Sequence, residues 1–282
     1  MSRWVFWDGG LGGASEAAVA TAITLGLRLP QRRILVNEGP AGLGLEEGIG
    51  QTVRFHDEMY REAVIPEHGL DALLRLQASG RLSPSNLADY TVPLLRDRLD
   101  LVCGTRAGGS AWKEAEKRRI ADVLDIAEQS YDGVVLLAAQ GQRLSELLRN
   151  QREDDVLVAV QPHRLGILDE RIEESAPFLS DFKTNLIFAL SPFDPRSRRW
   201  GISNLKRRYP VSLSLVGIPH HTEFSDAWND RDMVSYFRKI SLWPKRDGER
   251  ELLLKGYREL GDKLMELAGG EGTAVTPKEK GA

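Results

Sequence analysis

A glycine cluster directly after a short apolar run is the part of this sequence that could bind a phosphate group. The apolar run Trp4–Trp7 leads into Asp8-Gly9-Gly10-Leu11-Gly12-Gly13-Ala14-Ser15, and an alanine-rich helical pattern continues to about Leu29. A strand, a glycine loop and a helix N-terminus in this order present backbone N–H groups and a positive dipole to an anion. The loop contains no lysine, however, and Ala14 stands where such loops carry a hydroxyl. The sequence therefore predicts the shape of a phosphate site without its chemistry; a tight turn that needs no ligand is the alternative.

Other residues with reactive side chains lack the spacing that chemistry requires. The histidines that could hold a metal are His56, His163, His220 and His221. No Cys/His or helical spacing joins them, so surface loop histidines are the favoured interpretation. Ser15, Ser110 and Ser145 do not lie in a sharp turn that would present a nucleophile. We predict no catalytic residues and no metal site.

Composition describes an ordinary globular chain. The 282 residues are 41% hydrophobic and 28% charged, and the formal net charge is -3, which gives no overall attraction to nucleic acid or anionic membranes. Cys103 is the only cysteine, so an internal disulfide is excluded. No apolar run approaches the ~20 residues that cross a bilayer, and no secretory signal is visible. We expect a cytoplasmic protein with one domain over residues 1–268 and a disordered tail over 269–282.

The elements around the glycine cluster predict a parallel sheet. A strand, a helix over residues 14–27 and a second strand at Ile34–Val36 form a βαβ unit. Residues 37–50 contain five glycines and are predicted to be loop, and Ser83-Pro84 is predicted to start a short helix. Six or seven strands separated mostly by helices predict an α/β fold, a three-layer, mostly parallel twisted sheet with helices on both faces.

The order of these segments resembles the MinD/ParA branch of the P-loop ATPases over residues 4–240. That family's first motif is Lys-Gly-Gly-x-Gly-Lys-Thr-Thr. Asp8 stands in place of the signature lysine that reaches across the family's dimer, Gly13 replaces the phosphate-binding lysine, and Ala14 replaces the magnesium-binding hydroxyl. The motif positions that are retained are Gly9, Gly10, Gly12 and Ser15.

The family's later motifs are altered as well. Gly39 stands where the resemblance places a catalytic aspartate, and Leu137 replaces the aspartate near magnesium. Glu38 could be a surviving acid, although a solvated loop carboxylate is the favoured interpretation. The turn Ile218-Pro219-His220-His221 resembles the family's Ile-Pro turn near the base of the nucleotide.

These substitutions predict weak nucleotide binding and no hydrolysis. Losing a charge-assisted lysine hydrogen bond costs about 1.5–3 kcal/mol, which weakens binding roughly 10- to 100-fold. Asp8 adds repulsion toward a polyphosphate, and magnesium is left with few ligands. We expect no cofactor, with only weak ATP or ADP binding open to the loop.

The resemblance implies a role through protein contacts. Our first hypothesis is a non-hydrolysing pseudo-ATPase with degenerate Walker motifs that acts as a scaffold or localisation factor, with protein partners and a homodimer. The segments 69–87 and 98–105 resemble TadZ/CpaE-like localisation factors, which implies recruitment to a membrane-associated pilus or secretion machine. The alternative is an ATP-binding MinD/ParA-type ATPase with an unorthodox site that positions DNA or protein complexes. A third option is a regulator whose loop binds another anion.

Two surface features could bind partners other than those that the resemblance implies. The basic stretch Arg196–Arg208, with Trp200 inside it, could contact DNA or an acidic partner, and a solvated face is the simpler interpretation. The last predicted helix, residues 249–267, could be a membrane anchor, but its polar face mixes acidic and basic residues. Packing on the domain or on a partner is therefore favoured, and neither feature is a strong nucleic-acid or membrane signal.

Overall fold

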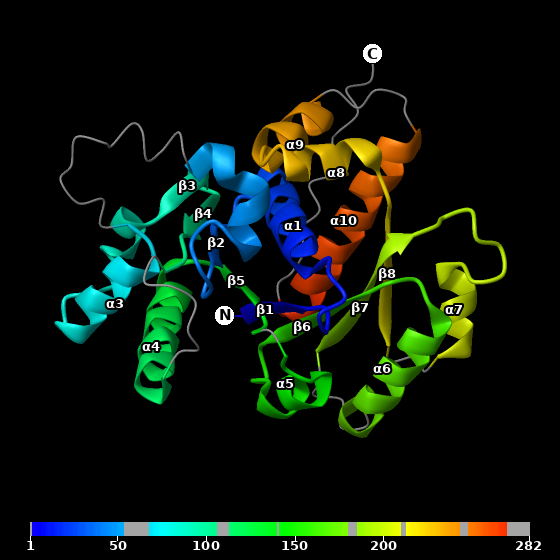
Figure 1. Ribbon diagram of the computed structural model, residues 1–282, viewed down its shortest axis with the longest axis horizontal. Coiled ribbons are helices and arrows are strands. Elements are labelled where there is room, and N and C mark those ends of the chain that lie inside the picture. Colours follow the sequence, from blue (N-terminus) through cyan, green and yellow to red (C-terminus); the bar gives the residue numbers. More distant parts are fainter. Residues whose placement is uncertain are drawn as a thin grey trace, which may run out of the picture.

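The fold is built on one continuous sheet. The computed structural model describes residues 2–53, 68–105, 113–139, 141–179, 185–209, 213–242 and 248–269 (Figure 1). The strands are β1 (Ser2–Trp7), β2 (Arg33–Val36), β3 (Val92–Leu95), β4 (Leu99–Val102), β5 (Gly133–Leu137), β6 (Val156–Gln161), β7 (Leu186–Phe193) and β8 (Ser214–Pro219). The described strands form an eight-stranded sheet in the order β3-β4-β2-β5-β1-β6-β7-β8.

Every neighbouring pair of strands is parallel except β3 and β4, which pair antiparallel at one edge. β1 lies between β5 and β6, with Phe6 opposite Leu137 on one side and Val158 on the other. Because parallel strands end at the same edge, the glycine loop after β1 shares that edge with the residues that follow β2, β5 and β6.

Helices cover both faces of the sheet. The helices are α1 (Ala14–Arg28), α3 (Leu70–Ala78), α4 (Glu114–Ser130), α5 (Leu144–Asn150), α6 (Leu165–Leu179), α7 (Ile202–Arg208), α8 (Thr222–Asn229), α9 (Met233–Leu242) and α10 (Gly248–Leu267), with the 3-10 helices η1 (Gly44–Ile49) and η2 (Leu87–Tyr90). Helices α1, α9 and α10 share a buried cluster on one face, and α3 to α7 supply the two clusters on the other. The expected three-layer α/β architecture is confirmed (Figure 1).

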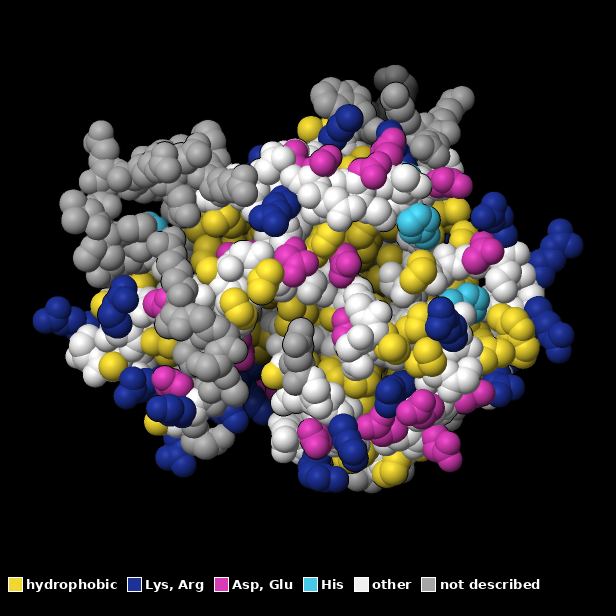
Figure 2. All heavy atoms as spheres, viewed as in Figure 1, with side chains coloured by type: hydrophobic (Ala, Val, Ile, Leu, Met, Phe, Trp, Pro, Cys, Tyr) yellow, Lys and Arg dark blue, Asp and Glu magenta, His cyan; other side chains and the backbone are white. Residues whose placement is uncertain are grey.

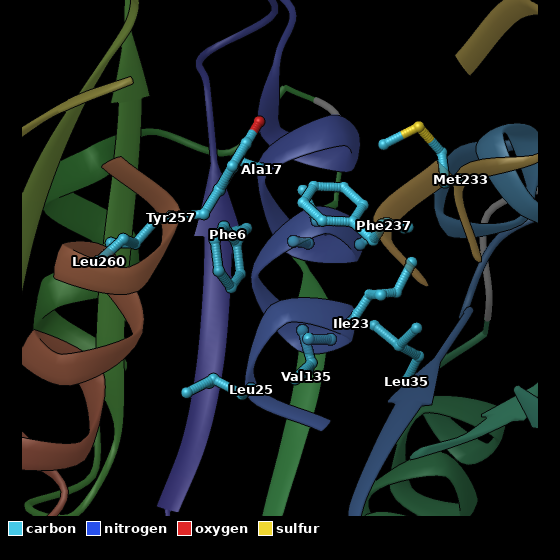
Figure 3. Packing of buried hydrophobic residues seen from close by; sticks show 14 of the residues in the cluster. Phe6, Ala17, Ile23, Leu25, Leu35, Val135, Met233, Phe237, Tyr257 and Leu260 are labelled. Carbon is cyan, nitrogen blue, oxygen red and sulfur yellow. The ribbon is translucent and has the colours of Figure 1, made fainter. Parts of the chain in front are cut away.

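Strand alternation assigns each buried side chain to one of these faces. Phe6 of β1, Val135 of β5 and Ile23 of α1 lie in the same buried cluster (Figure 3). Trp7 of β1 belongs to a cluster on the opposite face. Tyr257 of α10 is also buried in the α1 cluster. Helix α1 is buried along most of its length, between the sheet and the helices α9 and α10. This packing fixes the position of its N-terminus.

Several sequence predictions need correction. The sheet has eight described strands instead of six or seven, because both short strands around Asp97 pair at the sheet edge. Residues 37–50 are not wholly loop, because Gly44–Ile49 form η1. The turn after Ser83-Pro84 leads into the 3-10 helix η2 and not an α-helix. Helix α9 was not predicted.

The last predicted helix is α10, and it packs on α1 and β8. Within the described residues, no helix has the length and apolar character needed to span a bilayer. The predicted tail beyond residue 269 lies outside the described residues, as do His56 and Ser110.

Candidate functional site

The glycine loop between β1 and α1 is closed by a carboxylate from within the loop. The N–H of Gly10 donates to Oδ1 of Asp8 at 2.8 Å, and the N–H of Ala14 donates to Oδ2 at 3.2 Å. Ala14 is the first residue of α1, so one carboxylate holds both the loop and the helix N-terminus. These N–H groups point toward an anion that the chain itself supplies.

Left-handed backbone at four glycines makes this closure possible. Gly9, Gly10, Gly12 and Gly13 have φ angles of 66, 81, 85 and 102°. Residues with a side chain rarely adopt such angles, so the glycines are required by the turn whether or not a ligand binds. This backbone is compatible with both interpretations of the loop, a phosphate site and a tight turn that needs no ligand.

The loop is also anchored to the neighbouring strand β6. Gln161 is fully buried at the end of β6, and its Nε2 donates to the carbonyl of Asp8 at 3.3 Å. A Cβ placed on Gly13 would lie 3.3 Å from Cγ1 of Val160. The loop therefore rests against β6 on its inner side.

The first turn of α1 adds a second acidic group beside the loop. Burial raises the pKa of Glu16 above its ordinary value, and the negative charges of Glu47 and Asp8 raise it further. Acidic side chains gather at the centre of the face where α1 lies (Figure 2). The electrostatic environment is thus unfavourable for a polyphosphate.

Gly39, the position of the predicted missing aspartate, lies in a loop held by backbone and amide contacts. The N–H of Gly39 donates to Oδ1 of Asn37 at 3.1 Å, and its carbonyl accepts the N–H of Thr105 at 3.0 Å. A Cβ on Gly104 would fall 2.2 Å from the Gly39 carbonyl oxygen, so the two segments touch directly.

A buried carboxylate that the sequence did not reveal secures the same loop. Glu46 of η1 is 4% exposed and accepts hydrogen bonds from Nδ2 of Asn37 at 2.7 Å, the N–H of Gly104 at 2.5 Å and the N–H of Gly42 at 2.8 Å. All three donors come from the chain, so Glu46 serves the loop's structure. The one sequence signal for this role is the position of Glu46 in a glycine-rich segment, where backbone N–H groups need acceptors.

Leu137, at the position of the predicted missing metal ligand, makes an apolar contact. It packs at the rim of the α1 cluster, and a Cβ on Gly44 would lie 3.3 Å from its Cδ1. The prediction of a solvated Glu38 is wrong, because Glu38 is half-buried and burial raises its pKa. Within the described residues, no group of three or more His, Cys, Asp or Glu side chains could hold a metal ion.

Comparison with known proteins gives a match in structure and none in sequence. No protein-family model matches the sequence, and no curated protein matches it. A ParA family ATPase from Chlorobium tepidum TLS is similar with a TM-score of 0.58 and 16% identity, over 92% of this chain and 98% of that one. The chain has the MinD/ParA fold.

Two further MinD/ParA structures show the same extent of similarity. MinD in the MinC:MinD cell division complex of Aquifex aeolicus has a TM-score of 0.55 and 12% identity, over 92% of this chain and 96% of that one. A putative plasmid partition protein from Borrelia burgdorferi B31, bound to AMPPNP, has a TM-score of 0.58 and 11% identity, over 94% and 98%. These identities establish the fold alone.

The predicted base-side turn of this MinD/ParA fold lies at the end of β8 and the beginning of α8. Pro219 ends β8 and His220 is exposed, but the surface position predicted for His221 is wrong, because its side chain is 6% exposed. Nδ1 of His221 lies 3.4 Å from the hydroxyl oxygen of Tyr236. His221 was missed as a core residue because its partner comes from α9, which the sequence did not predict.

The fold brings some of the predicted site residues together and separates others. Residues 8–15 form one loop and helix start, while Gly39 and Leu137 follow or end strands on the same side of β1. His220 and His221 follow β8, three places from β1 in the sheet. His163 lies with Trp200 instead, where a ring nitrogen is 2.9 Å from the Trp200 carbonyl oxygen.

Proposed function

We propose that this chain is a non-hydrolysing member of the MinD/ParA fold that works as a scaffold or localisation factor through protein contacts. The observation that carries the proposal is the Asp8 carboxylate, which accepts the N–H groups of Gly10 and Ala14. In a phosphate loop, such groups are the ones that bind the ligand. Here they are satisfied by a covalently attached anion.

A tethered carboxylate is a strong competitor for these donors. It reaches them without the loss of translational freedom that a free ligand incurs on binding. A triphosphate would have to displace Asp8 and then lie beside its negative charge and that of Glu16. Both requirements favour a loop closed to nucleotide.

The residues present do not fit magnesium. Ala14 has no side-chain oxygen, Leu137 is in apolar contact near Gly44, and the Gly39 position has no carboxylate. Magnesium binds in nearly octahedral geometry through oxygen ligands. We therefore derive no phosphoryl-transfer step for this chain.

The fold supports a role in protein assembly, and the partners themselves are part of the proposal. The relative from Aquifex aeolicus forms a MinC:MinD complex, which supports an assembly role for the fold. We propose that this chain also acts by assembly, as a homodimer or with other proteins, and that its state does not change with nucleotide. A pilus or secretion machine is the setting that the TadZ/CpaE resemblance suggests.

A second candidate is an ATP-binding protein with an unorthodox site. The four left-handed glycines favour this candidate, because they keep the backbone conformation of a phosphate-binding loop. Asp8 would have to leave the loop N–H groups when a nucleotide binds. The two candidates differ in whether Mg·ATP binds the unmodified chain.

Thermal unfolding with and without Mg·ATP separates them. A ligand at 100 times its dissociation constant stabilises the folded form by about 2.7 kcal/mol. We expect no shift for the wild-type chain and no phosphate release, and a shift for Asp8→Ala, whose loop donors are free. Asp89→Ala, an exposed aspartate outside the loop, is the matched control and should behave as wild type.

A nucleotide shift or turnover in the wild-type chain, lost in Asp8→Lys or Gly13→Ala, would overturn the first candidate. If neither the wild-type chain nor Asp8→Ala shows a thermal shift with Mg·ATP, the scaffold proposal stands. Asp8 is then not the group that excludes the nucleotide.

A further inference from the structure

Four arginines near β7 and α7 carry positive charge that the fold leaves available. Together they form what we call the arginine edge: Arg164, Arg198, Arg199 and Arg207. All four are exposed, and none makes an ion pair with an acidic residue of the described chain. Lys and Arg side chains project along this edge of the molecule, at the right of the view (Figure 2), beside α7 and the loop before it (Figure 1).

The neighbouring cations behave differently. Arg196 pairs with Asp194 at 3.4 Å, and Arg208 pairs with Asp169 at 3.0 Å. Lys206 lies 3.9 Å from Glu259. These pairs mark the border of the arginine edge, and they show that nearby carboxylates are already engaged.

The backbone that carries the arginine edge is held in place. Nδ2 of Asn204 donates to the carbonyls of Arg198 at 2.9 Å and Arg199 at 3.1 Å. The guanidinium groups of Arg199 and Arg208 lie over the ring of Trp200, at 5.2 and 5.9 Å from its centroid. Because the loop is already ordered, binding would cost less conformational entropy than on a flexible arginine-rich segment.

We propose that the arginine edge is a docking surface for an acidic segment of a partner protein. Guanidinium groups match carboxylates with two parallel hydrogen bonds, so a surface with several of them suits a run of Asp and Glu side chains. The peptide test measures the charge of this edge, whereas the nucleotide test measures the loop donors held by Asp8, so the two proposals fail separately.

A nucleic acid fits this edge less well. The border holds the carboxylates of Asp169, Asp194 and Glu259, over which an extended phosphate backbone would have to lie. Trp200 is covered by guanidinium groups, so it offers no open ring for base stacking.

The test is fluorescence anisotropy of a labelled deca-glutamate peptide with the full chain. The variant Arg164→Glu/Arg198→Glu/Arg207→Glu removes three arginines of the edge and leaves the Trp200 stack in place. The matched control reverses three exposed arginines elsewhere, Arg81→Glu/Arg118→Glu/Arg119→Glu, two of which lie on α4 at the opposite side of Figure 1. Both variants change the net charge equally.

We expect the wild-type chain and the control to bind alike, and the edge variant to bind roughly tenfold or more weakly, since three exposed ion pairs are lost. Added salt should weaken wild-type binding. Should the edge variant unfold, Arg→Gln at the same three positions and at the three control positions gives the comparison.

Equal weakening in both variants would overturn the proposal, because net charge alone would then explain binding. So would a wild-type chain that does not bind the peptide. A short duplex DNA that binds in preference to the peptide, and loses affinity in the edge variant, would assign the surface to nucleic acid instead.

Discussion

Trp228 of α8 lies over Gly48 of η1 with no space for a side chain between them. A Cβ on Gly48 would fall 2.3 Å from Cε3 of the ring and 2.9 Å from Cγ of Met233. This contact packs the loop that carries Gly39 and Glu46 against the helix that follows His221. Packing therefore links the loop of Gly39 and Glu46 to the turn of His221.

Gly48→Ala should destabilise the fold, because the indole ring and α8 must move to admit a methyl group. Overpacking of this kind costs about 1–3 kcal/mol. Urea unfolding measures the difference. Gly166→Ala is the control, because Gly166 lies in the first turn of α6 with open space around its Cβ position, and alanine there should not destabilise the fold. Equal stability of Gly48→Ala and wild type would contradict the close contact.

Glu16→Gln should raise stability at neutral pH and reduce its dependence on pH. The folded pKa of Glu16 is raised from 4.5, so the folded chain holds a proton that the unfolded chain releases. Stability then falls as pH rises from about the ordinary value through the folded pKa. Glutamine removes that loss because it carries no charge to bury.

Chemical unfolding at a series of pH values between acid and neutral checks this sign for Glu16. Glu173→Gln, at an exposed position on α6, is the matched control for the loss of one carboxylate. A Glu16→Gln variant that is less stable than wild type at neutral pH would show that the carboxylate charge is favourable beside the helix N-terminus, against this prediction.

Restoring a lysine in the loop should not restore activity. Gly13 has a φ of 102°, and a Cβ there would lie 3.3 Å from Val160, so Gly13→Lys strains the backbone by about 1–3 kcal/mol. Thermal unfolding should show the loss, and phosphate release should stay at background because Gly39 and Leu137 supply no metal ligand. Gly12→Ala, with a φ of 85° and open space, separates backbone strain from the Val160 contact. Turnover in Gly13→Lys would contradict the prediction.

Local patterns predicted the sheet and the glycine turn because both depend on neighbours in sequence. Apolar runs such as Val156–Val160 must be buried strands, and four glycines between a strand and a helix require a tight turn. The three-layer architecture followed from the alternation of these elements. The resemblance to MinD/ParA supplied their order.

Contacts between distant segments could not be predicted in the same way. Asp8 was expected only to repel phosphate, because nothing in its neighbours shows that its side chain turns back to the Ala14 N–H. Glu46 meets Gly104, which lies 58 positions further along the chain, and His221 meets Tyr236 across α8. Charged or polar residues in loops suggest solvent exposure until their tertiary partners are known.

Arg33 and Arg32 adjoin in sequence, yet their removal should have opposite effects. Arg33 is 1% exposed and its Nη1 donates to the carbonyl of Gln31 at 3.0 Å, but it makes no ion pair with a described residue. Burial lowers its pKa to about 10. Arg32 instead pairs at 2.7 Å with Asp100, which is 4% exposed.

Arg33→Met should be neutral or stabilising, by up to about 3 kcal/mol, because a buried charge that burial penalises is removed and the side-chain stem is kept. Arg32→Met should destabilise by about 1–3 kcal/mol, because the buried Asp100 carboxylate loses its cation and, among the described residues, keeps the Tyr131 hydroxyl at 2.7 Å as its side-chain partner. Urea unfolding of the two variants at neutral pH gives the comparison. If Arg33→Met loses as much stability as Arg32→Met, then the Trp4 ring, 5.6 Å from the Arg33 guanidinium, holds that charge more favourably than burial penalises it.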